Sequence, residues 1–270
     1  MKNTTRTLTH QIFIALCLCV FVVSVVCADN SLPKELENVG IQQKLNSQLP
    51  LDLKFKDENG KRVILSDYFG RKPIILTFAY FDCPMLCSYV LGGTASALKV
   101  VNFNIGKEFD VLTISFDPSD TPAKASAQKA KYVGDYRRAG AENGWHFLTS
   151  DSETIRKITQ AAGFKYQYDA ETKQFAHASG IMVVTPQGKL ARYFYGVEFS
   201  PRDLRLALVE ASQNKIGSAV DQLLLFCYHY DPTTGKYGAV ALNLIRLGGI
   251  VTVVALGTFV VIMKRKEQHV

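Results

Sequence analysis

An unbroken apolar run, Pro73–Tyr80, most restricts the folds open to this chain. A strand that is apolar at consecutive positions is typical of a sheet buried on both faces, as in parallel sheets covered by helices. The run leads directly into a Cys-Pro-Met-Leu-Cys segment at residues 83–87, and residues 88–101 then lack proline and can form a helix. This order predicts an α/β architecture with both cysteines at a strand-to-helix junction.

Further elements follow in the same alternating order. Residues 51–65 alternate apolar and polar positions around Asn59-Gly60, which predicts a β-hairpin. We then expect a buried strand over 109–116, a helix through Tyr136, a strand at 145–148, a helix ending at Gly163, strands on both sides of 185–188, and a helix opening at Ser200-Pro201. This order predicts a thioredoxin-like α/β fold with an N-terminal β-hairpin extension and, from the apolar segment described next, a C-terminal transmembrane helix.

Both ends of the chain carry long apolar segments. Ile12–Val26 precedes Ala28 and a polar stretch, which predicts a signal peptide cleaved after Ala28, with an uncleaved anchor as the alternative. Leu247–Met263 has no charged residue and is followed by three basic residues, 264–266, which predicts a transmembrane helix with a cytoplasmic end rather than a buried core helix. The body between them is therefore expected on the periplasmic side of the inner membrane.

These observations give a full domain organisation. We expect a signal peptide at 1–28, a leader segment at 29–50 that wraps the domain, a thioredoxin-like domain at 51–215, a juxtamembrane linker at 216–238, a transmembrane helix at 239–263 and a cytoplasmic tail at 264–270.

The formal net charge of +7 comes mostly from the two ends. Removing Lys2, Arg6 and the charged residues of 264–267 leaves 26 basic against 23 acidic residues. No segment interleaves basic and aromatic residues in the way that nucleic-acid surfaces require. Nucleic acid is therefore not an expected partner, whereas the membrane is.

Cysteine usage points to a soft-metal or redox site. Three of the six cysteines fall in the signal segment, which leaves Cys83, Cys87 and Cys227. Three thiols cannot make a disulfide framework. In an exported protein, a pair four residues apart is a candidate redox dithiol or soft-metal site, and a helix N-terminus beside it favours thiolates.

A copper site needs a further donor, and a histidine is the natural choice for the divalent ion. Of the five histidines, His10 and His269 lie in the predicted end segments, and His146 lies inside a predicted strand. His177 lies just before an apolar strand, where a loop at the sheet edge can face the cysteines. A single histidine before a strand is more often a surface residue, so His177 becomes a candidate only in combination with the cysteine pair.

Three segments together resemble the Sco/SenC family of copper-binding proteins. They are Phe81–Cys87, Ser115–Pro122, and His177 with Ile181–Gly188, within a resemblance that covers roughly residues 45–210. The resemblance implies a thioredoxin fold in which Cys83, Cys87 and His177 bind Cu(I) or Cu(II). It also implies a copper chaperone, not an enzyme, whose partners are the copper-bearing subunit of cytochrome c oxidase and a copper donor protein.

Two features depart from the family pattern. Family members are usually held by an N-terminal helix, whereas the anchor predicted here is C-terminal. Asp82 places an acid directly before Cys83, which is expected to disfavour the thiolate slightly.

Other functions remain open at this point. A thiol-disulfide oxidoreductase is the main alternative, although such enzymes normally have two residues between the cysteines and a proline where His177 falls. A peroxidase fits less well, because Arg71 and Thr77 are not spaced for one. A structural Cys83–Cys87 disulfide would leave His177 without a role. Cys227 and His229 are a minor candidate for an auxiliary copper contact.

Overall fold

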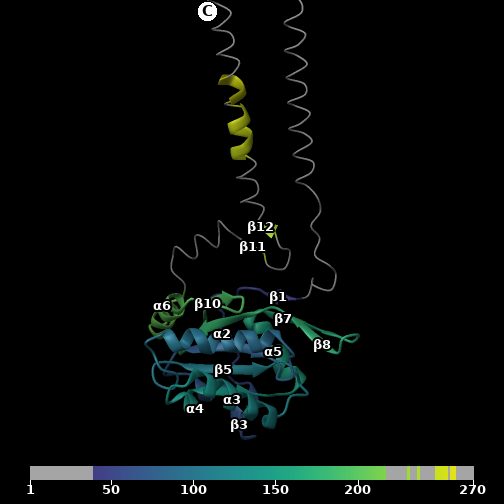
Figure 1. Ribbon diagram of the computed structural model, residues 1–270, viewed down its shortest axis with the longest axis vertical. Helices are drawn as coiled ribbons and strands as arrows, with labels where there is room; N and C mark the ends of the chain where they lie inside the picture. The colour runs from purple at the N-terminus through teal and green to yellow at the C-terminus, as the bar shows by residue number, and fades with distance from the viewer. Residues whose placement is uncertain (1–38, 217–229, 232–235, 238–246, 255, 260–270) are drawn as a thin grey trace, which may run out of the picture. The chain divides into compact units, whose positions relative to one another are not determined.

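The computed structural model describes residues 39–216, 230–231, 236–237, 247–254 and 256–259 (Figure 1). Its centre is a mixed five-stranded sheet in the order β10-β9-β4-β5-β6. The strands are β4 (Ile74–Ala79), β5 (Asp110–Ser115), β6 (Trp145–Leu148), β9 (Gly180–Val184) and β10 (Leu190–Tyr195). β4, β5 and β6 are parallel, while β9 runs antiparallel to β4 and β10 antiparallel to β9. The mixed α/β, thioredoxin-like architecture is confirmed.

β4 forms the middle of this sheet, as its apolar sequence predicts. All six of its residues are buried, and it pairs with β5 on one side and β9 on the other. Its one polar side chain is satisfied inside the core: the Thr77 and Thr113 hydroxyls are 2.8 Å apart, and Trp145 Nε1 donates to Thr113 Oγ1 at 3.0 Å. A buried strand with no unpaired polar group gives the segment after it a rigid starting point.

Helices connect the strands at the predicted places. They are α2 (Leu86–Val100), α3 (Pro122–Tyr136), α4 (Ala141–Gly144), α5 (Ser152–Ala162) and α6 (Pro201–Ser212). Thr121, Asp151 and Ser200 cap the N-termini of α3, α5 and α6 with side-chain oxygens. Gly163 ends α5 with a φ of +71°, and a Cβ there would lie 1.9 Å from the Gln42 carbonyl oxygen, so only glycine fits.

Two small sheets flank the central one. β2 (Lys54–Lys56) and β3 (Arg62–Ile64) form the predicted N-terminal hairpin, with Phe55 opposite Val63. β1 (Gly40–Ile41), β7 (Phe164–Asp169) and β8 (Gln174–His177) form a three-stranded sheet that the sequence analysis missed. The remaining short elements are a 3₁₀ helix, η2 (Leu65–Tyr68), and the pair β11 (Tyr230–Asp231) and β12 (Lys236–Tyr237).

The structure places His177 differently from the sequence prediction. We expected a loop, but His177 is the last residue of β8 and pairs with Tyr166 of β7. A signal for this hairpin was present, because Phe164, Tyr166 and Tyr168 alternate with polar residues. The histidine is therefore held by a strand pairing and not by a free loop.

The end segments are described only in part. Within the predicted leader, Ile41 and Leu49 are buried in the core, and β1 pairs with β7. The predicted signal peptide (1–28), the cytoplasmic tail (264–270) and most of the linker (216–238) lie outside the described residues. Residues 247–254 and 256–259 are helical, and the rest of the predicted 239–263 anchor is not described. Among the helices that the structure describes, none has the length and apolar character that crossing a membrane requires.

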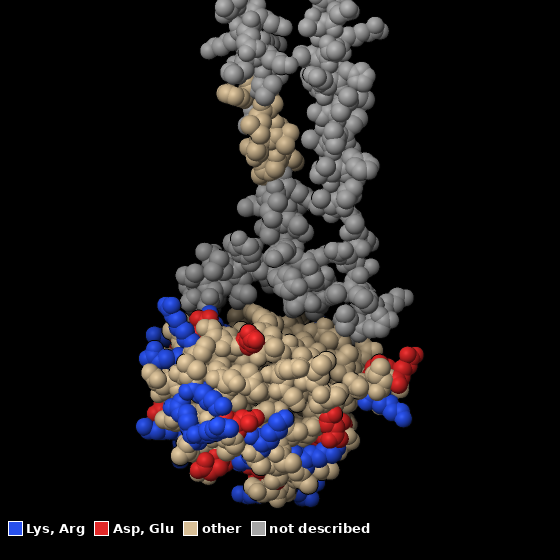
Figure 2. All heavy atoms as spheres, viewed as in Figure 1, with Lys and Arg blue, Asp and Glu red and all other residues tan. Residues whose placement is uncertain are grey.

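Charged side chains are unevenly distributed over the surface. In Figure 2, basic and acidic residues are interspersed on the part of the domain around α3 and α4, and few charged residues lie over α2. The sequence of α2 agrees, since Lys99 is its one charged residue. The helix that begins at the cysteines thus presents a mostly uncharged surface.

Candidate metal centre

Cys83 lies in the turn between β4 and α2, Cys87 lies in the first turn of α2, and backbone groups point at both sulfurs. The Cys87 N–H donates to Cys83 Sγ at 3.3 Å, and the Tyr80 N–H donates to Cys87 Sγ at 3.4 Å. The Cys83 N–H donates to the Tyr80 carbonyl at 3.3 Å and so closes the turn. Amide donors aimed at sulfur favour the anionic form that binds metals.

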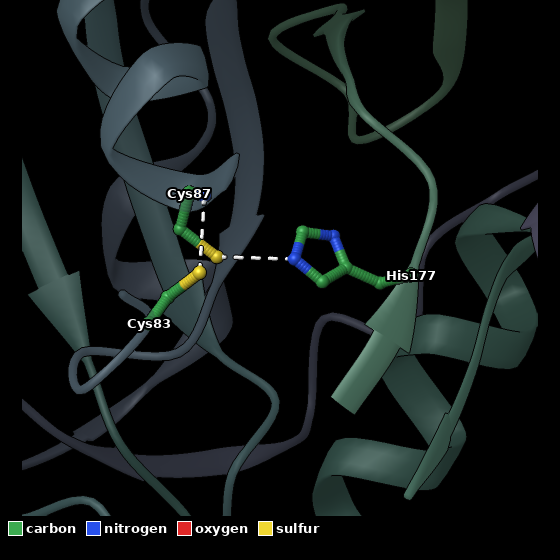
Figure 3. Close-up of side chains that lie close together, drawn as sticks. All are labelled: Cys83, Cys87 and His177. Atoms are coloured by element: carbon green, nitrogen blue, oxygen red, sulfur yellow. Dashed lines mark hydrogen bonds between the residues drawn. The ribbon is translucent and has the colours of Figure 1, made fainter. Parts of the chain in front are cut away.

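His177 faces the sulfurs from the opposite side (Figure 3). Its Nε2 lies 3.3 Å from Cys87 Sγ. Its Nδ1 lies 2.9 Å from the Ala178 carbonyl oxygen. A carbonyl only accepts hydrogen bonds, so this contact assigns the proton to Nδ1 and leaves the Nε2 lone pair directed at the sulfurs. The backbone therefore orients the ring in the way that metal-ligating histidines require.

Cys83, Cys87 and His177 form a compact donor set. Their three candidate ligand atoms all lie within 4.8 Å of one another, and within the described part of the chain no other group of three or more such residues does so. Cys87 is buried, with 3% of its surface exposed, whereas Cys83 is half-buried. Two sulfurs and an imidazole nitrogen suit a copper ion in either oxidation state. The structure brings together the three residues that the sequence singled out, in an arrangement that could hold a metal ion.

The pKa values of the two thiols are shifted in opposite directions. A hydrogen bond from the Cys87 thiol holds the pKa of Cys83 well below its usual range, although burial opposes the shift, and the backbone N–H groups of Cys87 and Met85 lower it further. The same hydrogen bond, together with burial, raises the pKa of Cys87. Without metal, Cys83 is therefore the thiolate and Cys87 keeps the proton. Binding of a metal by both sulfurs releases that proton, so metal affinity rises with pH.

Aromatic side chains surround the imidazole. The His177 ring centroid lies 5.1 Å from that of Phe116, 6.0 Å from Tyr80 and 6.2 Å from Phe164. Phe116 is fully buried, so this wall is part of the protein core. These residues could not be singled out from the sequence, because an aromatic residue near a strand end is ordinary core composition until the strands are paired.

The acid before Cys83 has a partner that the sequence could not reveal. Asp82 forms an ion pair with Lys124 of α3, a residue 42 positions later. The pKa of Cys83 is lowered despite the neighbouring carboxylate, and the cation of Lys124 compensates the charge of Asp82. The net shift of the Cys83 pKa is therefore opposite to the small rise expected from Asp82.

The acids of the 117–120 turn divide into two roles. Asp117 acts as a turn residue, because its Oδ1 accepts from the Ser119 N–H at 2.8 Å. Asp120 is buried and accepts at 2.8 Å from the N–H of Phe81, which lies two residues before Cys83. This contact of Asp120 links the turn before α3 to the metal centre. Cys227 and His229, the minor candidates, lie outside the described residues.

Comparisons with known proteins point in one direction. The family model described as SCO1/SenC matches residues 42–212. A SCO1 protein homolog of Bacillus subtilis is 26% identical over 153 residues, which cover 55% of this chain and 75% of that relative.

Solved structures share the fold. An Aquifex aeolicus protein, described as a candidate electron transfer protein, matches with a TM-score of 0.57 and 25% identity over 66% of this chain and 98% of its own. Arabidopsis thaliana ScoI, solved with copper bound, matches with a TM-score of 0.50 and 19% identity over 60% of this chain and 96% of its own.

Proposed function

This chain belongs to the SCO1/SenC family, and from that premise we propose that it is a copper chaperone. Cys83, Cys87 and His177 bind one copper ion, Cu(I) or Cu(II), and the protein delivers it to the binuclear copper site of cytochrome c oxidase or prepares the thiols of that site. The observation that carries the proposal is the convergence of these three side chains within 4.8 Å from segments 90 residues apart. Copper is the cargo of such a protein, not a resident cofactor.

The acidities of the donors suggest an order of binding. Cys83, half-buried and ionised, is the first donor that an incoming ion meets. Cys87 joins when its proton leaves, and His177 Nε2 closes the site without a change of tautomer. Release follows the reverse path: His177 leaves the ion first, and a sulfur or nitrogen ligand of the acceptor takes its place while both sulfurs still hold the ion.

The cellular setting of the proposal comes from the sequence. The apolar segments 12–26 and 247–263, with basic residues after the second, support an exported domain tethered to the inner membrane by a C-terminal helix. The domain then lies on the periplasmic side, where the copper-bearing subunit of the oxidase and a copper donor protein are its partners.

A second candidate function has one observation in its favour. A thiolate at Cys83 beside a protonated Cys87 is also the arrangement of a thiol-disulfide oxidoreductase, whose low-pKa cysteine attacks partner disulfides. Copper binding by both sulfurs requires them reduced, so reduction of oxidase cysteines before copper transfer is compatible with the main proposal.

Metal titration of the full chain in detergent separates these functions. The chaperone predicts stoichiometric copper and a thiolate-to-Cu(II) charge-transfer band, and it predicts that Cys83→Ala or His177→Ala removes the stoichiometric binding of Cu(II). A plain oxidoreductase predicts disulfide exchange that depends on both cysteines but not on His177. Retention of full copper binding by His177→Ala would contradict the chaperone proposal.

A further inference from the structure

Residues of α3, and one just before it, hold the peptide groups that precede Cys83. The Phe81 N–H donates to Asp120 Oδ2 at 2.8 Å, and Gln128 Nε2 donates to the Phe81 carbonyl at 2.8 Å. Lys124 pairs with the carboxylate of the next residue, Asp82. Lys124 and Gln128 lie one turn apart on the same face of α3, and Asp120, just before the helix, lies beside Lys124. Three side chains thus act on two consecutive residues.

Asp120 is the buried member of this group. Its side chain has no exposed surface, yet its oxygens are surrounded by donors. Oδ2 also accepts from Ser115 Oγ at 2.6 Å, and Oδ1 lies 3.4 Å from Lys124 Nζ. A buried carboxylate is retained only when several donors satisfy it, and removal of the carboxylate leaves those donors unpaired. The contact therefore joins the end of β5, the start of α3 and the turn after β4 into one unit.

The position of this unit gives it a function at the metal centre. Phe81 is 6% exposed, so its ring is fixed in the core, while Asp120 just before α3 and Gln128 on α3 hold both of its backbone polar groups. From Phe81 to Cys83 only one residue intervenes, and Lys124 holds that residue by its side chain. Little freedom remains between α3 and the Cys83 sulfur, which must stay within reach of Cys87 and His177.

We propose that Asp120, Lys124 and Gln128 are positioning residues of the copper site, which set the location of Cys83 by holding Phe81 and Asp82. This inference rests on the proposed function. It assigns to one face of α3, together with Asp120, the positioning of the half-buried sulfur of Cys83. Supporting groups of this kind around a metal typically contribute about 10–100-fold to its affinity.

The test uses the full chain in detergent and compares single variants by Cu(I) competition with a chelator and by the Cys-to-Cu(II) charge-transfer spectrum. Asp120→Ala and Gln128→Met are expected to weaken Cu(I) binding by about 10-fold or more and to shift the band. Asp120→Asn keeps an oxygen for Phe81 and Ser115 and is expected to stay closer to the parent. Lys124→Met is also expected to weaken Cu(I) binding. Its matched control is Lys131→Met, because Lys131 is on the same helix but contacts the ring of Tyr132 and not the cysteine turn.

A metal-free measurement tests the same contact directly. Hydrogen exchange at the Phe81 amide is expected to be slow in the parent protein and in Lys131→Met, and much faster in Asp120→Ala. Gln128→Met carries the test if Asp120→Ala does not fold, because Gln128 is only half-buried. Variants that unfold at lower temperature but keep the parent's copper affinity and spectrum would overturn the inference and leave these residues a purely structural role. Absence of copper binding by the parent would instead contradict the proposed function, while the Phe81 exchange would still report the contact.

Discussion

The two sides of the metal centre are built differently. The sulfur side follows β4, whose residues are all buried, and Cys87 itself is 3% exposed. The imidazole side is the last residue of β8, a strand whose other residues are half-buried or exposed. Its neighbour β7 connects to β1 through only two residue pairs, and Tyr168 near the hairpin tip is 52% exposed.

This difference separates two tasks that a copper carrier must combine. Elements with many buried contacts open only when much of the domain unfolds, whereas elements with few such contacts open at lower free-energy cost. The cysteines belong to the first kind and the histidine to the second. Holding the ion is thus a property of the sulfur side, while the imidazole side adjusts coordination and access.

Removal of either sulfur is expected to have the largest effect. In Cys83→Ala and Cys87→Ala, one sulfur and one imidazole remain, too few soft donors to retain Cu(I) against a chelator. We expect loss of stoichiometric copper in both, measured as metal per chain after desalting. Ser88→Ala is the control, because Ser88 directly follows Cys87 in the first turn of α2. This variant should keep its copper. Equal copper content in a cysteine variant and the control would remove the distinction between the two sides.

Removal of the imidazole is expected to have a smaller and more selective effect. His177→Ala should lose Cu(II) binding, because that ion favours the nitrogen donor. It should keep Cu(I), with an affinity lower by on the order of 100-fold. This loss is larger than the loss expected when a residue that only supports a metal ligand is removed. Chelator competition measures both. His146→Ala, a change on β6 near Glu58, should bind both ions like the parent. A Cu(I) loss as complete as in the cysteine variants would show that both sides hold the ion equally.

The acidity of the two thiols gives a pH-dependent prediction for the sulfur side. Because the pKa of Cys83 is lowered, its thiolate persists as pH falls, while the raised pKa of Cys87 keeps that thiol protonated. At pH 6, alkylation of metal-free protein should modify Cys83 first, with on the order of 100-fold more thiolate than a free cysteine of pKa about 8.5. Peptide mass mapping after short reaction times reads the two sites. Equal modification, or faster modification of Cys87, would reverse the assignment of the proton.

The aromatic support of the hairpin gives the smallest expected effect. Phe175 is half-buried and contacts Tyr80 and Phe116, so Phe175→Ala should lower the free energy of unfolding by about 1 kcal/mol and copper affinity a few-fold through His177. Phe109 is fully buried just before β5, at the end of β4 opposite to the cysteine turn, and Phe109→Ala should cost about 3–5 kcal/mol. Its folded fraction should nonetheless bind copper like the parent. Denaturant unfolding and copper competition on the same samples check both; a larger copper effect from Phe109→Ala would contradict the comparison.

The sequence predicted the sulfur side better than the imidazole side, for a physical reason. β4, the cysteine turn and α2 are consecutive in the chain, so local pattern and composition carry their structure. The β7–β8 hairpin depends on pairing with β1 and on ring contacts with Phe116, which comes 61 residues before His177. His177 was identified as a candidate, but its strand and its hydrogen bond to Ala178 could not be predicted.

The α3 contacts to the cysteine turn were also beyond reach of the sequence. Asp120 has the composition and spacing of an ordinary turn or cap residue, and Lys124 and Gln128 those of an exposed helix face. Only the packing of α3 beside the turn after β4 reveals that Phe81 and Asp82 are their partners. Long-range polar contacts of this kind leave no periodicity to detect.

X-ray absorption of the full chain loaded with one equivalent of copper tests the central claim most directly. We predict two sulfur neighbours and one nitrogen neighbour for each copper atom, with the nitrogen contribution lost in His177→Ala loaded with Cu(I). A parent spectrum with only oxygen and nitrogen neighbours, or one that His177→Ala leaves unchanged, would contradict the claim.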